Sequence, residues 1–326
     1  MDKPLVSVII PVYNRGPLVV EAIESVLKQD YSNYEVIIGD NCSTDGTYEL
    51  LKKKYENNNR VYIFQNKMNL GPVGNWIKCY EKARGKYVKI LWSDDLISSN
   101  YISETVRHLE KRPDAAFAYG RVVVFSDESQ LVDPQKIEER TAYKGIIKSG
   151  CYPGEAFIRL TYQRGYSLPV SPGCAIFRRE KIKILDSIPN QIGYDHSING
   201  AGTDLLIFLN ALSRGERFIY IDRAVSYFRA HPTSISTMDK TIMDGYFTAK
   251  LYYLYQERIN DYWYSINSEI VINHLRRKVL NRFKNRAILR PYYRADAPER
   301  LKESVFQTLS WGLRNKLYYK KTRAVL

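Results

Sequence analysis

The sequence lacks an apolar run long enough to cross a membrane. Its most apolar segment extends from Val6 to Val12, contains Pro11 and falls well short of the roughly 18–20 residues that a spanning helix needs. The first residues, Met1 to Pro4, lead directly into that segment without a positively charged stretch or a cleavage site. The sequence therefore predicts no signal peptide, and we expect a cytoplasmic location.

Glycine-rich phosphate-binding loops are also missing. No Gly-x-Gly-x-x-Gly sequence follows the first expected strand, and no Gly-Lys-Ser/Thr loop occurs. Dinucleotide oxidoreduction and ATP hydrolysis are therefore disfavoured. The 4 cysteines lie far apart without metal-ligand spacing, which predicts reduced thiols in a cytoplasmic protein.

The net charge of +14 is concentrated at one end of the 326 residues. Residues 241–326 hold 17 of the 49 Lys/Arg and 7 of the 35 Asp/Glu, a balance of +10 that leaves +4 for the remainder. Such a segment is typical of a protein with an anionic partner, a membrane surface or a nucleic acid, or of a solvated helical surface. Aromatic residues between the charges, such as Tyr252 and Trp263, favour packing first and a membrane surface second, and we expect no nucleic acid.

The first 125 residues alternate between strand-like and helix-like patterns. Short β-branched runs predict strands, and apolar positions at helical spacing predict the helices between them. The expected strands are Val6–Ile10, Tyr34–Ile38, Val61–Phe64 and Tyr87–Trp92, with helices opening at Pro17 and covering Thr47–Tyr55 and Val73–Ala83. This alternation predicts an α/β fold with a mainly parallel, Rossmann-like sheet flanked by helices.

Beyond about residue 125 the pattern is less regular. The expected helices are Gly154–Tyr162 and Leu205–Leu212, and the expected strands are Cys174–Arg178, Arg217–Ile221 and Ala224–Phe228. From Lys240 the pattern is helical and rich in aromatic and basic residues. We therefore expect three parts, residues 1–125, 126–240 and a helical C-terminal extension over 241–326.

Polar residues follow three of the expected strands. They are the stretches Pro11 to Arg15, Asp40 to Gly46 and Ser93 to Asp95. Because ligands of an open parallel sheet bind outside the carboxyl ends of its strands, these residues are expected along one rim. Their aromatic ring, amides, hydroxyls and carboxylates suit a nucleoside diphosphate with a divalent cation.

The adjacent acids Asp94 and Asp95 are the sharpest local feature. They directly follow the apolar strand that ends at Trp92, so they are aimed at the rim. A diphosphate carries concentrated negative charge, which a hard cation held by carboxylate oxygens neutralises. Adjacent acids are also common in turns and helix caps, and the pair by itself leaves that alternative open.

Five short motifs stand in order along this part of the chain. They are VSVIIPVYN (6–14), DNCSTDGT (40–47), NLG with GN (69–71 and 74–75), ARGKY (83–87) and SDD (93–95). In order and spacing they resemble the inverting glycosyltransferases of family 2, which have the GT-A fold. The resemblance is strong over residues 5–120 and weaker to about 240. It implies that residues 1–125 bind a nucleotide-sugar and that 126–240 bind the acceptor and carry catalysis.

The resemblance also implies the members of the nucleotide-sugar site. Base and ribose would contact Pro11, Tyr13 and Asp40, and a divalent ion, Mn²⁺ or Mg²⁺, would bind Asp95. The full set of expected nucleotide-sugar contacts is Pro11, Tyr13, Asn14, Asp40, Asn41, Asn75, Asp94 and Arg229. The family often has two adjacent acids where this chain has Asp40-Asn41. UDP is therefore the default donor nucleotide, and dTDP and CDP stay open.

Inversion at the anomeric carbon of the donor requires a carboxylate that accepts the proton of the acceptor hydroxyl. The family has this acid at the start of a helix in its second half, and the matching stretch, Gly202 to Phe208, implies Asp204 as the base. Thr203 stands where the family usually has an acid. Asp195 is the competing candidate, and a helix start with Asp in its first turn is the structural alternative.

Two further stretches resemble family segments around the donor. Ser171 to Arg179 matches a small-residue turn that borders the donor sugar and acceptor, although a plain turn into a strand has the same pattern. Tyr227 to Ser236 is similar to the closing His-x-x-Ser-x-Ser segment. It implies that Arg229 or His231 reaches the diphosphate or the metal, with His231 as a metal ligand.

These observations predict a metal-dependent inverting glycosyltransferase that acts on a carbohydrate or lipid-linked acceptor in surface glycan biosynthesis, peripheral to the inner face of a membrane. One alternative is an inactive domain that binds a nucleotide-sugar or polysaccharide, which predicts loss of Asp94, Asp95 or Asp204. Another is a nucleotidyltransferase, which predicts a basic phosphate-binding loop early in the chain, where only Arg15 is available.

Overall fold

The computed structural model describes residues 3–126, 148–162, 171–188, 194–230 and 242–256. The chain divides into two compact units, one formed by residues 1–188 and 195–246 and the other by 189–194 and 247–326. The sheet and all the site residues below belong to the first unit. Within the described ranges no helix is both long and apolar enough to span a membrane. The expected boundaries at residues 125 and 240 stay predictions.

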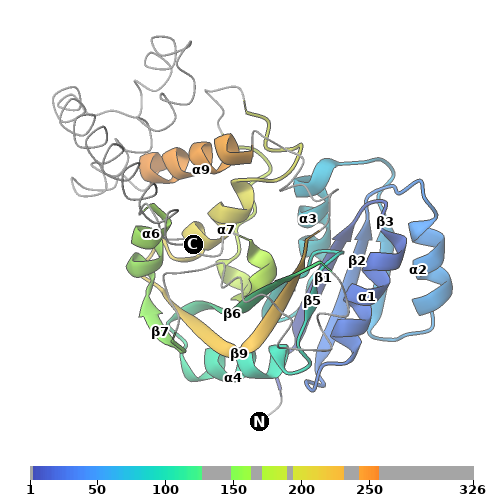
Figure 1. Ribbon diagram of the computed structural model, residues 1–326, viewed down its shortest axis with the longest axis horizontal. Helices are drawn as coiled ribbons and strands as arrows, with labels where there is room; N and C mark the ends of the chain where they lie inside the picture. The colour runs from blue at the N-terminus through green and yellow to red at the C-terminus, as the bar shows by residue number, and fades with distance from the viewer. Residues whose placement is uncertain (1–2, 127–147, 163–170, 189–193, 231–241, 257–326) are drawn as a thin grey trace, which may run out of the picture. The chain divides into compact units, whose positions relative to one another are not determined.

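The first half of the sheet consists of parallel strands joined by helices. The strands are β1 (Val6–Val12), β2 (Tyr34–Asp40), β3 (Val61–Gln65) and β4 (Tyr87–Ile90), in the spatial order β3-β2-β1-β4. The helices are α1 (Gly16–Leu27), α2 (Thr47–Tyr55) and α3 (Gly71–Lys82). Every residue of β1, β2 and β4 is buried, which explains why these strands are mostly apolar, apart from Ser7, Glu35, Asp40 and Lys89, rather than alternating. The predicted α/β architecture is confirmed (Figure 1).

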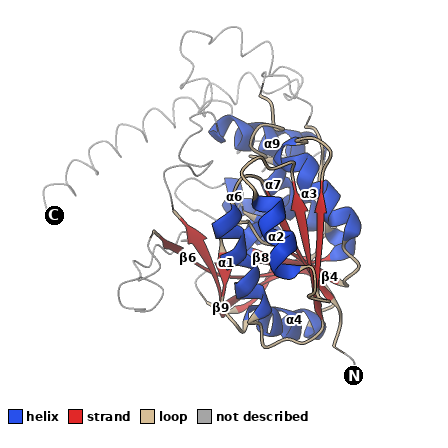
Figure 2. Ribbon diagram, turned by 90° about the vertical axis from the view of Figure 1, so that its right-hand side faces the viewer, coloured by secondary structure: helices blue, strands red, loops and turns tan. Residues whose placement is uncertain are grey.

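The second half of the sheet is mixed. Its long strands β6 (Ala115–Phe125) and β9 (Arg217–Arg229) run parallel, and β8 (Ala175–Arg178) joins β6 to β4 through antiparallel pairs. The short strands β5 (Leu96–Ile97) and β7 (Gly150–Pro153) both pair antiparallel with β9. In Figure 2 the strands form one layer with helices on its flanks. The described residues thus form a nine-stranded sheet, parallel in its first half and mixed in its second.

The expectation of two strands at Arg217–Ile221 and Ala224–Phe228 is wrong, because β9 is continuous. Asp222 and Arg223 are exposed and resemble the polar end of a strand. The register shows instead that Gly120 pairs with Ile221 and the next residue of β6 with Val225, so the polar residues form a bulge within the strand. A Cβ at Gly120 would lie 2.0 Å from the Ala224 carbonyl oxygen, which explains the glycine opposite the bulge.

The sequence patterns did not identify α4 (Tyr101–Lys111) or β6. The β6 sequence opens with Ala-Ala-Phe-Ala-Tyr-Gly, which contains few of the β-branched residues that mark strands. Helix α4 packs on β6 and β9 and buries Ile102, Val106 and Leu109. These elements complete the core on which the second half of the chain is assembled.

An aromatic cluster holds two helices against the second half of the sheet. Phe117 of β6 lies 5.1–5.7 Å, centroid to centroid, from Phe157, Phe177, Phe208 and Phe218. Phe157 belongs to α6 (Gly154–Tyr162) and Phe208 to α7 (Thr203–Ala211), so both helices pack on the same centre. Helix α7 is almost entirely buried, including the acid in its first turn.

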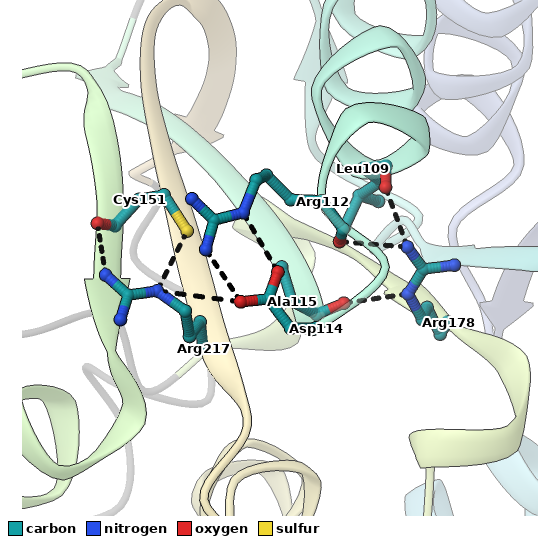
Figure 3. A network of polar contacts seen from close by, with 7 residues as sticks. All are labelled: Leu109, Arg112, Asp114, Ala115, Cys151, Arg178 and Arg217. Atoms are coloured by element: carbon teal, nitrogen blue, oxygen red, sulfur yellow. Dashed lines mark hydrogen bonds and ion pairs between the residues drawn. The ribbon is translucent and has the colours of Figure 1, made fainter.

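Two arginines form hydrogen bonds around the turn between α4 and β6 (Figure 3). The buried Arg178 guanidinium donates to the carbonyl oxygens of Leu109 (2.7 Å), Arg112 (3.1 Å) and Ala115 (2.8 Å). Arg112 forms a bidentate pair with Asp114 (2.9 and 2.6 Å). These bonds satisfy carbonyls at the end of α4, so Arg178, within the stretch that resembles a donor-binding segment, serves the fold.

Gly200 is expected to tolerate no side chain. It lies just before α7 with φ +73°, and a Cβ there would sit 2.2 Å from the Trp76 ring of α3. Gly200→Ala should lower the free energy of unfolding by about 1–3 kcal/mol through overpacking, with about 1–2 kcal/mol more from the left-handed backbone. Gly215→Ala is the matched control in urea denaturation, because Gly215 has φ +81° and no atom within 4 Å of its added Cβ. Equal losses in the two variants would contradict the packing argument.

Candidate active site

The loops that follow β1 and β2 are joined by hydrogen bonds. The Asn14 backbone N–H donates to Ser43 Oγ (2.9 Å), and Asn14 Oδ1 accepts from the Thr44 N–H (2.8 Å). Asn14 has φ 51°, a left-handed conformation that asparagine adopts more readily than most residues. Pro11 is buried within β1, whereas Tyr13 is 43% exposed. The two loops therefore form one surface at the carboxyl ends of adjacent parallel strands.

Asp40 ends β2 with a completely buried carboxyl group. Its Oδ1 accepts from the Ser43 N–H (2.9 Å) and from Gln65 Nε2 (3.0 Å). Its Oδ2 is buried and has no hydrogen-bond partner among the residues that the structure describes. Leaving a buried carboxylate oxygen without a donor is costly. The site is therefore suited to a ligand that brings an N–H or O–H to this oxygen.

The side chain of Asn41 is fully used within the protein. Its Nδ2 donates to Asn69 Oδ1 (2.8 Å) and to the Gly71 carbonyl (3.1 Å). Its Oδ1 accepts from Asn66 Nδ2 (3.0 Å) and from the Leu70 N–H (3.0 Å). Two donors and two acceptors are the whole capacity of an amide. Asn41 therefore holds the loop between β3 and α3, and its amide has no group left for a ligand.

The side chain of Asn75, in α3, also serves contacts within the protein. Its Nδ2 donates to the Gly39 carbonyl (2.8 Å), and its Oδ1 accepts from Asn66 Nδ2 (3.0 Å). Gly39 directly precedes Asp40, and a Cβ at Gly39 would lie 2.9 Å from Asn75 Oδ1. Asn75 thus fixes the end of β2 that carries the Asp40 carboxyl group.

Asn41→Asp, which restores the acid common in the family, is expected to destabilise this chain. A carboxylate cannot donate, so it would face the Asn69 Oδ1 and Gly71 carbonyl oxygens without a proton between them. We expect a loss of about 1–3 kcal/mol, the usual cost of a buried unsatisfied polar group. Chemical denaturation at pH 7.5 measures it, and partial recovery near pH 4, where a protonated carboxyl group regains one of the two donors, is the internal control. Unchanged stability at both pH values would show that this network contributes nothing.

Asp94 and Asp95 lie after β4 in a chain of charged groups. Asp94 Oδ2 pairs with Arg15 Nη1 (2.8 Å). Asp95 is buried, and its Oδ1 accepts from the Arg229 N–H (3.0 Å). The Arg229 guanidinium donates to the Asp94 carbonyl (3.1 Å) and to the Glu21 carboxylate. The structure therefore brings together Asp94, Asp95 and Arg229, which the sequence analysis placed in one site.

The electrostatics around Asp95 fit a divalent cation. Burial and the neighbouring Asp94 raise the pKa of Asp95 well above its usual range, although the Arg229 N–H and the Lys89 ammonium oppose the shift. A bound cation would compensate both penalties. Magnesium-like ions are commonly held by one or two carboxylates together with substrate phosphates and water. In the described ranges no group of three or more His, Cys, Asp and Glu could hold a metal by itself, and His231 lies outside those ranges.

A short helical turn, η1 (Pro172–Cys174), is fastened beside these acids by side chains of several elements. Trp92, two residues after the end of β4, donates from Nε1 to Ser171 Oγ (2.7 Å), and its ring lies 4.9 Å from that of Trp76. The fully buried Lys89 donates to the Gly173 carbonyl, and burial lowers the pKa of its ammonium to about 7. The stretch predicted to border the donor therefore lies against β4 and against Trp92, which stands two positions before Asp94.

Asp204 lies in the first turn of α7 and is 8% exposed. Its Oδ1 accepts from the N–H groups of Gly202 (2.8 Å) and Leu205 (2.7 Å), and its Oδ2 accepts from the Tyr246 hydroxyl (2.9 Å). Burial raises the pKa of Asp204 to about 7, more than these donors lower it. A carboxyl group that exchanges a proton near neutral pH is suited to general base catalysis.

Asp195, the competing candidate, has a different environment. It is exposed, and its Oδ1 accepts from both the Ser197 N–H (2.9 Å) and Ser197 Oγ (2.6 Å). These bonds lower the pKa of Asp195 below its usual value. Asp195 is thus a weak base that stabilises a turn.

Sequence reasoning missed several contributors to the site. Arg15 was considered only as a phosphate-binding residue, and its ion pair with Asp94 joins residues 79 positions apart. Lys89 had a visible signal, a lysine inside the apolar strand that precedes the two acids. Tyr246 had none, because nothing in a helical pattern shows that its hydroxyl meets a carboxyl group 42 positions earlier.

Comparisons with known proteins relate this sequence to one family. The model of glycosyl transferase family 2 matches residues 7–185, which is 179 of the 326 residues. TuaG of Bacillus subtilis, named as a teichuronic acid biosynthesis glycosyltransferase, is 32% identical over 152 residues, 46% of this chain and 60% of TuaG. WcaA of Escherichia coli, named for colanic acid biosynthesis, is 34% identical over 129 residues, 39% of this chain and 46% of WcaA. The chain therefore spans less than two thirds of these relatives.

Solved structures show the same fold at low sequence identity. TarS of S. aureus (residues 1–349) with UDP-GlcNAc has a TM-score of 0.60 and 16% identity, with 92% of this chain and 79% of that chain covered. The same protein with UDP has a TM-score of 0.56 and 17% identity over 85% and 73%. This likeness confirms the predicted GT-A-type architecture. Because the family model matches more than half of its residues, this chain belongs to glycosyl transferase family 2.

Proposed function

We propose that this chain is an inverting glycosyltransferase that binds a nucleoside diphosphate sugar along Asp40, Asp94 and Asp95 and uses Asp204 as its base. The observation that carries the proposal is the buried Asp40 Oδ2, which has no hydrogen-bond partner among the described residues, in a member of this family. The N3–H of uracil or thymine is a donor of the kind that such an oxygen accepts. UDP, bound in one TarS structure, is therefore the default nucleotide.

Binding and orientation fall to the rim. Tyr13 offers an exposed ring for the base, and the loop of Asn14 and Ser43 offers polar groups for the ribose. Asp95 would hold a divalent ion, which supplies positive charge to the diphosphate leaving group when bound. Arg229 holds the Asp95 carboxylate through its backbone N–H and the Asp94 carbonyl through its guanidinium, and Arg15 pairs with the Asp94 carboxylate.

The chemical step assigns a separate task to Asp204. The acceptor oxygen attacks the anomeric carbon from the face opposite the diphosphate, its O–H proton moves to Asp204, and the bond from the anomeric carbon to the phosphate oxygen breaks. The product is the glycoside with inverted configuration together with the nucleoside diphosphate. A carboxyl group with a pKa of about 7 is deprotonated for a large fraction of the time at neutral pH, yet is basic enough to accept this proton.

The biological setting follows from the named relatives. TuaG and WcaA are named for the biosynthesis of teichuronic acid and colanic acid, so a carbohydrate or lipid-linked acceptor of a surface glycan is the class we propose. The basic residues of 241–326, most of which lie outside the described residues, would bring the enzyme to an anionic membrane surface from the cytoplasmic side.

The rival functions have less support. A nucleotidyltransferase would use Arg15 for phosphate, whereas Arg15 pairs with Asp94. An inactive domain would have lost one of the three acids, and Asp94, Asp95 and Asp204 are all present.

Mass spectrometry of reactions with UDP-, dTDP- and CDP-sugars, each with Mn²⁺ or Mg²⁺, tests the proposal. We expect nucleoside diphosphate release from one donor class, slowly to water and faster with a suitable glycan acceptor. Donor binding without any release, with or without acceptors, would favour the inactive binding domain.

A further inference from the structure

The two oxygens of the Asp204 carboxyl group have different surroundings. Oδ1 accepts two backbone N–H groups, from Gly202 and Leu205, which belong to the start of α7 itself. Oδ2 accepts the Tyr246 hydroxyl at 2.9 Å, and this is the one side-chain hydrogen bond that the described residues make to the carboxyl group. Because Oδ1 is occupied by two fixed donors, Oδ2 is the oxygen that remains basic enough to accept a proton.

Tyr246 comes from a separate element. It lies in the first turns of α9 (Ile242–Gln256) and is half-buried, next to the buried Gly245. A hydroxyl can donate to a carboxylate and can also accept from a protonated carboxyl group. Tyr246 can therefore keep its hydrogen bond to Oδ2 before and after proton transfer, which a backbone N–H cannot do.

We propose that Tyr246 is a positioning residue that orients Oδ2 of Asp204 toward the acceptor hydroxyl and stabilises the carboxylate form of the base. This inference rests on the proposed function, because Asp204 needs orientation only if it acts as the base. It gives α9 a part in catalysis, although α9 lies outside residues 7–185, the range that the family model matches.

The neighbouring titratable groups do not account for the same effect. His196, in the loop before α7, is buried, and burial lowers the pKa of its imidazole, so it is neutral at pH 7. Cys174 of η1, which packs on α7, is neutral too because burial raises the pKa of its thiol to about 12. Asp195 is exposed and bonded to Ser197. Asp244, also in the first turn of α9, carries the nearby acidic charge of that helix.

Tyr246→Phe removes the hydroxyl and keeps the ring. With full-length protein and the donor that is turned over, we expect kcat to fall about tenfold, as for loss of a hydrogen bond to a charged group, with the donor KM unchanged. The acid limb of the pH profile of kcat should move to higher pH, because loss of the donor raises the pKa of Asp204 further. Tyr252→Phe is the matched control, with the same substitution on the same helix at a half-buried residue, and should match wild type. Asp244→Asn tests whether charge on α9 moves the limb instead.

Three results would overturn the inference: an unchanged kcat and limb in Tyr246→Phe, a higher kcat, which would make Tyr246 an obstruction, or an equal shift in Asp244→Asn. In an Asp204→Asn background, Tyr246→Phe should change the residual rate less than about twofold, because coupled residues are non-additive. If no donor reacts, the proposed function fails separately. The pH dependence of the melting temperature then still tests the contact, because Tyr246→Phe should extend to higher pH the range over which wild type loses stability. Coincident curves would exclude it.

Discussion

Replacing Asp204 by Asn is expected to lower kcat by about 10²–10⁴-fold, the usual contribution of a general base, with nucleotide affinity unchanged. An amide cannot take the acceptor proton. Its oxygen can still accept from the Gly202 and Leu205 N–H groups, and its NH₂ can donate to the Tyr246 hydroxyl, so the fold is retained. Initial rates of nucleoside diphosphate release and calorimetric titration with the nucleotide measure the two quantities.

The same group is expected to set the pH dependence of kcat and to contribute to that of stability. Because its pKa lies at about 7, wild-type kcat should rise with pH below 7 and level off above it. For stability the sign is opposite. The folded pKa is raised above the usual value of 3.8, so the folded protein holds a proton that the unfolded chain has lost between about pH 4 and 7, and stability falls as pH rises through that window. Asp204→Asn should therefore melt at a higher temperature than wild type at pH 8, with little difference near pH 4.

Asp195→Asn is the control for these measurements. Asp195 is exposed and bonded to Ser197, so its substitution should leave kcat and the pH profile close to wild type. An inactive Asp195→Asn beside an active Asp204→Asn would transfer the role of base to Asp195.

Asp40→Asn is expected to change the preferred base. The amide oxygen can keep the bonds from Ser43 N–H and Gln65 Nε2, which places NH₂ where Oδ2 now lies. That NH₂ opposes the N3–H of uracil but can donate to N3 of cytosine, which is an acceptor. UDP affinity should fall about 10–100-fold, as expected for an unsatisfied buried group, while CDP affinity rises.

Calorimetric titration of wild type and Asp40→Asn with UDP and CDP provides the test, and the opposite directions of the two affinity changes are an internal control against misfolding. Parallel losses of both affinities would mean that Asp40 supports the loop without contacting the base.

Local patterns predicted the part of the molecule built from local contacts. Composition predicted the apolar strands β1, β2 and β4 within a few residues. Periodicity predicted the bounds of α2 and α6 exactly. The rim was predictable as well, because parallel strands carry their following loops to one edge.

The rest depends on contacts between distant parts of the chain. The bulge at Asp222 resembles a strand end until its pairing with β6 is known. Asn41 resembles a ligand contact until the Asn66 to Gly71 loop is seen to use its whole amide. Nothing in the sequence around Tyr246 indicates a role in the site, which is visible only from its contact with Asp204. In each case the deciding partner lies 25 or more residues away, beyond the range of periodicity or turn chemistry.

The most direct test of a nucleotide-sugar site on this rim is thermal unfolding of the full-length chain with UDP, dTDP, CDP, GDP and ADP, each with and without Mn²⁺. A ligand that binds the folded state raises the melting temperature by mass action. We predict a Mn²⁺-dependent rise with UDP or another pyrimidine diphosphate, absent in Asp95→Ala and weaker with the purines. No rise with any of the five, or an equal rise that persists in Asp95→Ala, would contradict the proposed site.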